Sequence, residues 1–342
     1  MPDGLTYRAA GVDLEAARRA KQAIRALVDA TRDQQTLSEM GSFAGLYAVP
    51  DGFRQPVLVS SADGVGTKVR VAFLADRHDT IGRDLVNHCV NDILVQGARP
   101  LFFLDYLASG KLHEHVVADV VRGVAYGCKD NGCVLLGGET AEMPDSYPAG
   151  EYDLAGFIVG IAERNRILSG ERIRAGHVLV ALASDGLHTN GYSLARRILF
   201  DSLELAPSDP FPGAQRTVAD VLLDPHRSYL AALWPLVEQG RVRGLAHITG
   251  GGLEGNLPRV LPAGLGAWIE RSSWEIPPVF RVIADAGKVS DAEMFRVFNM
   301  GIGMVAILAI EDVDAVLAAL RAAGETAWRV GEVVAGDGVE LR

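Results

Sequence analysis

The feature of this chain that most constrains its fold is the alternation of short apolar runs with amphipathic stretches, broken once by a polar segment. Residues 163–177 (ERNRILSGERIRAGH) are rich in charge and lie between two apolar runs typical of strands. We therefore predict two domains, 1–165 and 175–342, joined by a linker at 166–174. A length of 342 residues agrees with two domains of roughly 100–200 residues each.

The same alternation predicts an α/β or α+β architecture in both domains. In the first half we expect helices at 14–30, 80–95 and 114–127, and strands at 57–60, 101–107, 134–136 and 154–161. In the second half we expect strands at 178–183, 266–270, 302–310 and 328–334, and helices near 190–201, 226–238, 278–286 and 313–323. The chain has no short-period repeat of the kind that builds solenoids.

Composition argues against two classes of partner. The chain carries 33 basic and 43 acidic side chains, a net charge of −10, and no dense run of Lys or Arg. Nucleic acids and anionic membranes attract basic surfaces, so we expect neither as a partner. The longest apolar stretch, 301–310, is about half of the ~20 residues that span a bilayer.

The cysteines and the N-terminus predict the compartment. Cys89, Cys128 and Cys133 form no C-x-x-C pair and no spacing that suits zinc. An odd number of cysteines without such pairing suits a reducing cytosol. The start of the chain lacks the basic residues and apolar run of a signal peptide. We therefore expect a cytoplasmic protein.

The first segment that carries chemistry is 60–68 (SSADGVGTK), directly after a predicted strand. Its two glycines let the backbone approach a ligand closely, and Asp63 and Lys68 flank them. A carboxylate at a strand end suits Mg²⁺, which takes hard oxygen ligands, and a Lys suits phosphate oxygens. The spacing is not that of a Walker loop. A simple glycine turn between two elements is the alternative.

Two further segments of the first half have similar ingredients. Asn91 and Asp92 lie on the polar face of the helix predicted at 80–95, where Asp92 would pair with Asp63 if the two are close in space. A solvated helix face explains them equally well. The segment 137–144 (GGETAEMP) again places glycines and carboxylates after a strand. Three such segments in one domain suggest a site for phosphate and metal.

In the second half, two polar segments follow predicted strands or precede helices. The segment 184–193 (SDGLHTNGYS) offers His188 and Asn190 as substrate contacts, although Asn190 also suits an N-cap of the following helix. The segment 247–252 (HITGGG) enters a predicted helix, whose backbone N–H groups can bind an anion such as a substrate phosphate. A packing turn is the alternative for this glycine-rich stretch.

In order, spacing and total length these segments resemble the aminoimidazole ribonucleotide (AIR) synthetase family, the phosphoribosylformylglycinamidine cyclo-ligases. The segments that carry the resemblance run almost from end to end: 7–13 (YRAAGVD), 60–68, 90–92 (VND), 97–106 (GARPLFFLDY), 137–144, 153–157 (DLAGF), 184–193, 247–262 and 293–304 (EMFRVFNMGIGM). Three positions depart from the family: Gly255 replaces the usual Glu, Val297 a common Thr, and Asp185 the usual Ser. The roles of these three positions stay open.

The resemblance implies a reaction. The family closes formylglycinamidine ribonucleotide (FGAM) to 5-aminoimidazole ribonucleotide (AIR) in de novo purine biosynthesis, consuming ATP and releasing ADP and phosphate. Amide oxygen is a poor leaving group, and transfer of the γ-phosphoryl group to it makes its departure easy. Such chemistry needs Mg²⁺, positive charge around the triphosphate and two substrates held in line. The resemblance also implies a homodimer in which the N-terminal domains share a β-barrel.

The resemblance also assigns roles to residues. The carboxylates expected to bind Mg²⁺ are Asp63, Asp92 and Glu139. The residues expected to contact ATP are Lys68, Gly64, Gly66, Thr67, Gly137 and Gly138. The residues expected to contact or orient the substrate are His188, Asn190 and Glu142, with His188 moving a proton during ring closure. The residues expected to hold the ribose phosphate are Thr249, Gly250, Gly251 and Gly252.

Other ATP-using enzymes of the same superfamily are disfavoured by particular residues. Selenophosphate synthetase needs a reactive Cys or selenocysteine near its N-terminus, and the first cysteine here is Cys89. The hydrogenase-maturation relative ends in a functional Cys, whereas this chain ends in Arg342. Thiamine-phosphate kinase lacks the 137–144 pattern, and the amidotransferase of the preceding step is far longer. A non-catalytic nucleotide-binding protein is the other alternative, but its expected loss of carboxylates is not seen.

Overall fold

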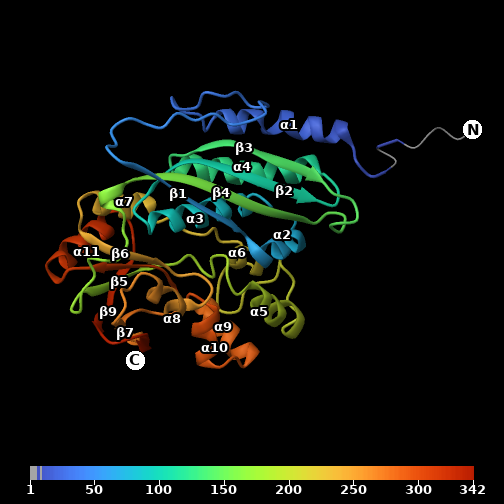
Figure 1. The fold of residues 1–342 in the computed structure, drawn as a ribbon. Helices are drawn as coiled ribbons and strands as arrows, with labels where there is room; N and C mark the ends of the chain where they lie inside the picture. Colours follow the sequence, from blue (N-terminus) through green and yellow to red (C-terminus); the bar gives the residue numbers. More distant parts are fainter. Residues whose placement is uncertain (1–5, 8–9) are drawn as a thin grey trace, which may run out of the picture.

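The computed structural model describes residues 6–7 and 10–342 and contains two sheets, one above the other in Figure 1. The four strands of the first sheet are β1 (Pro56–Gly64), β2 (Arg99–Ser109), β3 (Val134–Glu142) and β4 (Tyr152–Glu163). Their order is β1-β4-β2-β3, and β2 with β3 is the parallel pair. The helices of this domain are α1 (Leu14–Asp29), α2 (Val69–Ala75), α3 (Ile81–Leu94) and α4 (Glu114–Asp130).

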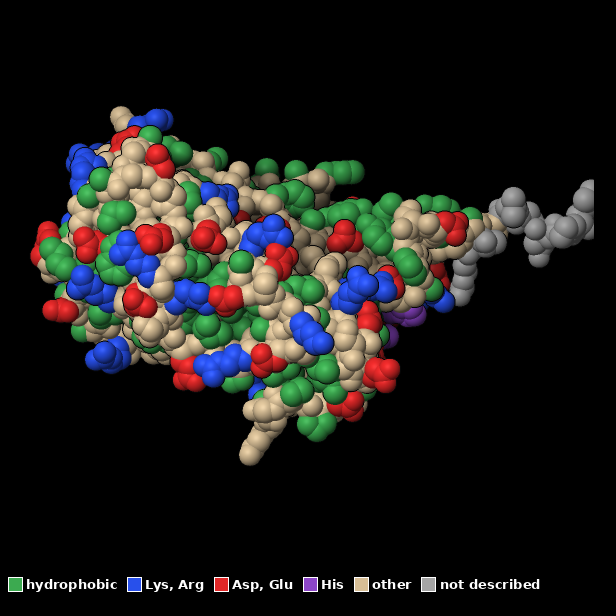
Figure 2. All heavy atoms as spheres, turned by 90° about the horizontal axis from the view of Figure 1, so that it is seen from below, with side chains coloured by type: hydrophobic (Ala, Val, Ile, Leu, Met, Phe, Trp, Pro, Cys, Tyr) green, Lys and Arg blue, Asp and Glu red, His purple; other side chains and the backbone are tan. Residues whose placement is uncertain are grey.

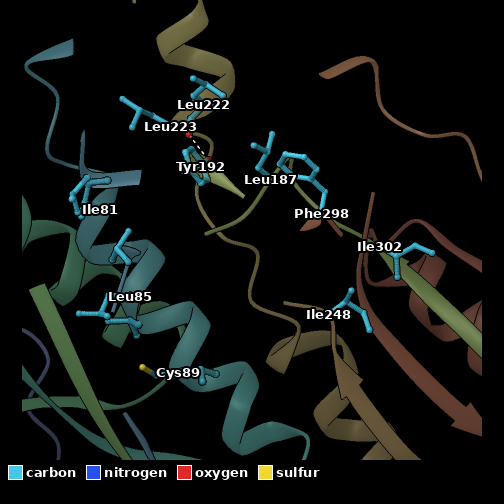
Figure 3. Close-up of a cluster of buried hydrophobic side chains, with 14 of the residues drawn as sticks. Ile81, Leu85, Cys89, Leu187, Tyr192, Leu222, Leu223, Ile248, Phe298 and Ile302 are labelled. Carbon is cyan, nitrogen blue, oxygen red and sulfur yellow. Dashed lines mark hydrogen bonds between the residues drawn. The ribbon is translucent and has the colours of Figure 1, made fainter. Parts of the chain in front are cut away.

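Helix α3 is the centre of the first domain. It packs against β1, β2 and β4 and also against α4. Ile81, Leu85 and Cys89 follow one another along its apolar face, as Figure 3 shows. The contact with α4 is close enough to require glycine, because a Cβ atom at Gly82 would collide with the carbonyl oxygen of Val120. The position of α3 is therefore fixed from both sides.

The second sheet has six strands in the order β10-β7-β9-β5-β8-β6. These are β5 (Val178–Ala183), β6 (Val242–His247), β7 (Leu265–Ile269), β8 (Ile302–Leu308), β9 (Ala327–Ala335) and β10 (Val339–Leu341). The helices of this half are α5 (Tyr192–Arg196), α6 (Val218–Leu222), α7 (Leu230–Glu238), α8 (Gly252–Asn256), α9 (Pro278–Gly287), α10 (Asp291–Val297) and α11 (Val313–Ala322). Every residue of β8 is buried, as its continuous apolar sequence indicates.

The predicted α/β architecture is confirmed, and the differences lie in short elements. The helix expected near 190–201 is α5 followed by a π-helical turn at Arg197–Ser202. The helix expected at 226–238 begins only at Leu230, because residues 226–229 are hydrogen-bonded to α3. The strand β6 was not predicted, since Arg243 and Gly244 interrupt its short apolar pattern.

The face of the first sheet opposite α3 is apolar and partly open. Ala62, Phe157 and Leu104 lie side by side on it across three strands. The ring of Tyr47 packs on Phe102 and covers part of this face. Leu58 and Phe157 stay 62% and 46% exposed. A lone chain would not be expected to leave such a surface in water without a use for it.

The surface seen from below in Figure 2 intermingles acidic and basic side chains, with no large area of Lys and Arg alone. This agrees with the absence of a basic run in the sequence. Among the helices of the described residues, none combines the length and the hydropathy needed to cross a membrane.

Candidate active site between the two domains

The candidate site lies where α3 meets the second domain. Asp84, His88 and Asp92 are spaced four residues apart, so they share one face of α3. Sequence reasoning left open whether the Asn91–Asp92 face is solvated. The structure buries it: Asn91 is 0% exposed, donates from Nδ2 to the carbonyl of Arg227 and accepts the backbone N–H of Tyr229. The solvated-face alternative is therefore wrong.

The structure brings the predicted carboxylates Asp63 and Asp92 to the same imidazole. Asp63 Oδ2 lies 2.7 Å from His88 Nε2, and Asp92 Oδ2 lies 3.9 Å from that nitrogen. Asp92 also accepts from Ser61 Oγ at 3.0 Å. Both carboxylates keep contact with solvent, with side chains 42% and 28% exposed. The partly exposed carboxylates of Asp63 and Asp92 therefore lie beside the buried imidazole of His88.

Three further histidines extend this arrangement into the second domain. His247, at the end of β6, places Nδ1 2.9 Å from Asp92 Oδ1 and Nε2 2.9 Å from His226 Nε2. The ring centroids of His88, His226 and His247 lie 5.0–5.1 Å from one another. The ring of His188 stacks on His226 at 4.0 Å. Four imidazoles thus fill the space between the domains.

Burial and neighbouring charge together shift the pKa values of these four histidines. Burial lowers the pKa of His188, His226 and His247, and the positive charges of neighbouring groups add to this effect in His188 and His226. Burial also opposes protonation of His88, but its hydrogen bond to Asp63 and the charges of Asp92 and Asp63 outweigh it and raise its pKa. His88 is therefore the ring of this cluster that best carries a positive charge.

The pKa values of the two carboxylates respond to the same contacts. Burial would raise the pKa of Asp63, but the hydrogen bond and charge of His88 outweigh it and the pKa is lowered. Burial is likewise outweighed at Asp92 by the hydrogen bond and charge of His247, which lower its pKa. Both side chains are therefore held as carboxylates, the form that can bind a cation.

Lys68 lies inside the protein. Its side chain is 0% exposed, and Nζ lies 2.8 Å from Asp84 Oδ1 and 2.6 Å from the carbonyl oxygen of Asp224. Asp84 also accepts the backbone N–H of His226 at 2.6 Å. The ammonium group of Lys68 therefore links the two domains through a buried ion pair with Asp84 and a hydrogen bond to Asp224. In this arrangement the donors of Lys68 point away from solvent, and its contact with phosphate stays a prediction.

His188 is also buried. Its Nε2 accepts the backbone N–H of Asp185 at 3.1 Å, and its side chain is packed inside with a backbone φ of +58°. The substrate contact expected of His188 stays a prediction, and in this structure the residue is 1% exposed. Nδ1 of His188 is buried and has no hydrogen-bond partner among the described residues.

Asn190 lies beside the glycine-rich turn of the second domain. The structure excludes the capping alternative, because Gly191 is the N-cap of α5 and no side chain caps it. A Cβ at Gly250 would lie 3.1 Å from Asn190 Oδ1, so the segments 184–193 and 249–252 meet. Asn256 Nδ2 donates to the carbonyl oxygens of Thr249, Gly250 and Gly252 and fixes the shape of the turn.

The segment 137–144 does not join the carboxylate pair. Glu139 is aligned with Gly64 across the sheet, three strands away, a separation of roughly 14 Å at ~4.8 Å per strand. Since neighbouring residues of a strand point to opposite faces, Glu139 and Asp63 also lie on opposite faces. Glu139 therefore cannot share one ion with Asp63 and Asp92 within this chain, and that prediction is wrong.

Glu142 serves as a backbone acceptor. Its carboxylate accepts the N–H groups of Asp13 at 2.6 Å and Leu112 at 2.9 Å, which ties the start of α1 to the end of β3. It also lines a cavity of about 770 Å³ that Pro144 and Tyr147 share. Both carboxylate oxygens of Glu142 therefore already accept hydrogen bonds from the backbone, and the predicted role of Glu142 in orienting the substrate stays a prediction. Gly137 and Gly138 lie inside β3, where a Cβ at Gly138 would collide with the carboxylate of Asp105.

The loop after β1 faces the second domain. Thr67 Oγ1 lies 3.0 Å from Ser193 Oγ, and a Cβ at Gly66 would lie 3.8 Å from the carbonyl oxygen of Thr189. Gly64 donates its N–H to Asp63 Oδ1 at 2.7 Å. The segments 60–68 and 184–193 therefore adjoin one another across the domain junction.

One of the three departures from the family pattern has a clear partner. Asp185 forms a two-point ion pair with Arg227, at 2.7 and 3.0 Å, and Arg227 also binds Glu325 at 2.7 Å. A Ser at this position could not form that pair. Val297 packs against the core at the end of α10, and nothing in the structure explains Gly255, around which a Cβ would find open space.

Sequence reasoning missed His88, His226 and His247 as members of the site. The four-residue spacing of Asp84, His88 and Asp92 was a signal for a shared polar face on α3. His226 had no signal, since it lies in a loop with no recognisable motif. His247 was visible only as the residue before the 248–252 turn.

Two family descriptions match this chain. The N-terminal domain of AIR synthase related proteins matches residues 44–162, and the C-terminal domain of AIR synthase related proteins matches residues 174–342. The chain belongs to the AIR synthase family. The resemblance drawn from the sequence is therefore confirmed. The first matched segment contains the first sheet except Glu163, and the second contains the second sheet.

Curated relatives within the AIR synthase family are similar over almost the whole chain. The phosphoribosylformylglycinamidine cyclo-ligase of Trichlorobacter lovleyi is 52% identical over 329 residues, which cover 96% of this chain and 94% of the relative. The enzyme of the same name from Sorangium cellulosum is 53% identical over 332 residues, covering 96% and 95%.

Solved structures share the fold of this AIR synthase chain at much lower identity. Thiamine-monophosphate kinase from Stenotrophomonas maltophilia superposes with a TM-score of 0.71 at 18% identity, covering 93% of this chain and 95% of the kinase. The hydrogenase maturation protein HypE of E. coli gives 0.66 at 20% identity, covering 94% and 93%. At these identities the likeness shows the fold alone.

Proposed function

We propose that this protein catalyses the ATP-dependent closure of FGAM to AIR, with release of ADP and phosphate, as a cyclo-ligase of purine biosynthesis. The strongest support is that curated relatives of that name are about half identical to this chain over 96% of its length. The carboxylates Asp63 and Asp92 at the domain junction agree with such a reaction. Phosphoryl transfer needs Mg²⁺ held by carboxylates and two substrates held in line, and Asp63 and Asp92 at the domain junction suit the first of these needs.

The reaction we infer transfers the γ-phosphoryl group of ATP directly to the formyl oxygen of FGAM. The amidine nitrogen then attacks the activated carbon, the C–N bond forms, and the oxygen leaves with phosphorus as inorganic phosphate. No covalent intermediate with the protein is needed. In agreement with this, all three cysteines are buried, and burial raises the pKa of the Cys89 and Cys128 thiols, which disfavours the nucleophilic thiolate.

The residues present fit a magnesium ion at the junction. Asp63 and Asp92 are carboxylates with lowered pKa values, partly exposed, and close to one another through His88. Hard carboxylate oxygens are the ligands that Mg²⁺ prefers. When bound there, the ion would neutralise phosphate oxygens of ATP. The chain's own part is to hold the two carboxylates in place, Asp63 through His88 and Asp92 through His247 and Ser61.

Residues other than Lys68 can also supply positive charge for the triphosphate. A cavity of about 690 Å³ lies beside Ser193, the partner of Thr67, and Arg70, Arg196 and Arg197 line it. Nε of Arg196 is buried there with no hydrogen-bond partner among the described residues, and burial together with the charge of Arg70 lowers the pKa of Arg196. We infer that this cavity receives phosphate groups of ATP, whose oxygens would supply the acceptor that Arg196 Nε lacks, whereas Arg70 already pairs with Glu151.

Isotope transfer tests the proposed function. With the formyl oxygen of FGAM labelled with ¹⁸O, a single turnover with ATP should deliver the label to inorganic phosphate and none to water. Label in water would show that ring closure expels hydroxide and that phosphoryl transfer does not activate the carbonyl. ADP release that depends on FGAM is the accompanying measurement, since a non-catalytic nucleotide-binding protein would show none.

We infer that the protein is a homodimer and that the open face of the first sheet is the contact. The support is the exposed apolar row that includes Leu58 and Phe157. A Phe157→Glu variant should shift sedimentation from dimer to monomer, and an unchanged dimer would place the contact elsewhere. The three unpaired cysteines support a cytoplasmic location.

A further inference from the structure

The histidines of the junction create a donor set that magnesium does not need. His88, Asp92 and His247 each offer one ligand atom, and the three atoms lie within 4.8 Å of one another. Two imidazoles and one carboxylate suit Zn²⁺, Co²⁺ or Fe²⁺ far better than Mg²⁺. We propose that His88, Asp92 and His247 form a binding site for a divalent transition-metal ion, which competes with Mg²⁺ for Asp92.

The distances between the donors are those that one ion can bridge. Metal–nitrogen and metal–oxygen bonds of about 2.0–2.2 Å place ligand atoms on one ion roughly 3–4 Å apart. Asp92 Oδ1 lies 2.9 Å from His247 Nδ1, and Asp92 Oδ2 lies 3.9 Å from His88 Nε2. Small rotations of these side chains are therefore enough to bring all three onto an ion.

The hydrogen bonds around the cluster can fix both rings with the two required nitrogens deprotonated, the state that an ion needs. His88 Nδ1–H and His226 Nδ1–H can both donate to Thr189 Oγ1, at 2.9 and 3.4 Å, because a hydroxyl oxygen has two acceptor positions. His247 Nε2–H can then donate to His226 Nε2 at 2.9 Å. Each ring is neutral in this metal-bound arrangement. Without an ion, His88 Nε2 donates its proton to Asp63 Oδ2 at 2.7 Å and His247 Nδ1 donates to Asp92 Oδ1 at 2.9 Å, so a bound ion displaces these two protons.

The hydrogen bonds to the far nitrogens of His88 and His247 resemble those that support the ligands of known metal sites. A metal-bound imidazole usually donates its other N–H to a nearby acceptor, which fixes its tautomer and orientation. Thr189 does this for His88, and His226 does it for His247. His88 and His247 are buried, whereas Asp92 is partly exposed, so an ion can reach the site from the carboxylate side.

Asp63 is a neighbour of this site and is not among its ligands. It contacts His88 at 2.7 Å, but within the part of the chain that the structure describes, the three-donor group is His88, Asp92 and His247. This separates the new site from the magnesium site proposed above, which needs Asp63. The two share Asp92, and a test that measures metal binding without turnover does not depend on the proposed function.

The test titrates metal-free protein with Co²⁺ and follows the visible absorption bands that imidazole and carboxylate ligands give to this ion. Wild-type protein should bind a single equivalent, and Zn²⁺ should displace it at stoichiometric amounts. His88→Gln and His247→Gln should each abolish the bands. The matched control is a His113→Gln/His115→Gln variant, which removes two histidines that contact each other at the start of α4. This variant should retain the Co²⁺ bands.

Two more variants make the outcome decisive. Asp63→Asn should retain Co²⁺ binding while it loses the magnesium-dependent reaction, so failure of one proposal is distinguishable from failure of the other. His226→Gln should weaken Co²⁺ binding by roughly 10–100-fold, because His226 orients His247. Thermal melting of each variant checks that it folds. Absent Co²⁺ bands in the wild type, or equal binding by folded His88→Gln, would overturn the proposal.

Discussion

Two segments of the first domain contain the same ingredients, glycines and carboxylates at the end of an apolar strand, and the structure uses them differently. In the segment 60–68, Asp63 faces His88 at the domain junction and Lys68 is tied to Asp84. In the segment 137–144, Glu139 is exposed on the opposite face of the sheet, and Glu142 binds backbone N–H groups. The two segments therefore share their residue types but differ in the groups that surround their carboxylates.

The difference teaches that strand order and register decide what such a segment can do. β1 is an edge strand whose end runs into α2 and meets the second domain. β3 is the opposite edge, and its end meets the start of α1. A carboxylate beside imidazoles stays available to a cation on its exposed side, whereas one that accepts two backbone N–H groups is used for structure.

The largest effect is expected from Lys68→Met, which leaves Asp84 buried without its partner. Removal of one member of a buried ion pair costs about 3–5 kcal/mol in the free energy of unfolding. Urea denaturation followed by fluorescence measures it. The Lys68→Met/Asp84→Leu double variant is the control and should recover much of the loss. If Lys68→Met costs under about 1 kcal/mol, the ammonium is not the tie between the domains.

Asp63→Asn should lower turnover on the order of 10²–10³-fold, the range seen when one electrostatic contact to the reacting group is lost. The Asp63 side chain is 42% exposed at the end of β1, so thermal melting should change little. ADP release is measured across a Mg²⁺ titration. The matched variant Glu139→Gln lies on the other segment and should keep turnover near wild type. Equal losses in both variants would erase the distinction between the two segments.

Glu142→Gln should destabilise the protein without removing its chemistry. The neutral amide oxygen can replace only one of two charge-assisted hydrogen bonds, so we expect a loss of roughly 1–3 kcal/mol in the free energy of unfolding. The exchange rates of the Asp13 and Leu112 amide hydrogens should rise in the variant, and hydrogen–deuterium exchange measures this. If turnover instead falls as far as in Asp63→Asn, Glu142 acts on the substrate and its structural role is secondary.

Much of the fold was predictable from the sequence, because long periodic elements such as α3, α4 and the strands of both sheets follow local patterns. The pairing of Asp63 with Asp92 was also predictable, through the resemblance to the family. The burial of Lys68 and the arrival of His226 and His247 at α3 were not. These contacts join residues 139 to 156 positions apart, and no local pattern encodes which distant loop covers a polar helix face.

A pH-dependent effect is expected at Asp105, which lies on β2 directly against Gly138 of the second segment. Burial raises the pKa of Asp105 to about 7, whereas an unfolded chain releases this proton near pH 4. Between these values the folded protein holds a proton that the unfolded chain has lost, so the wild type loses stability as the pH rises. Asp105→Asn removes this loss. The melting temperature of the variant relative to the wild type should therefore increase from about pH 4 to pH 7 and remain constant above it. If the difference in melting temperature between the two proteins instead stays constant across that pH range, Asp105 is ionised in the folded state, with water or a cation reaching it beside Gly138.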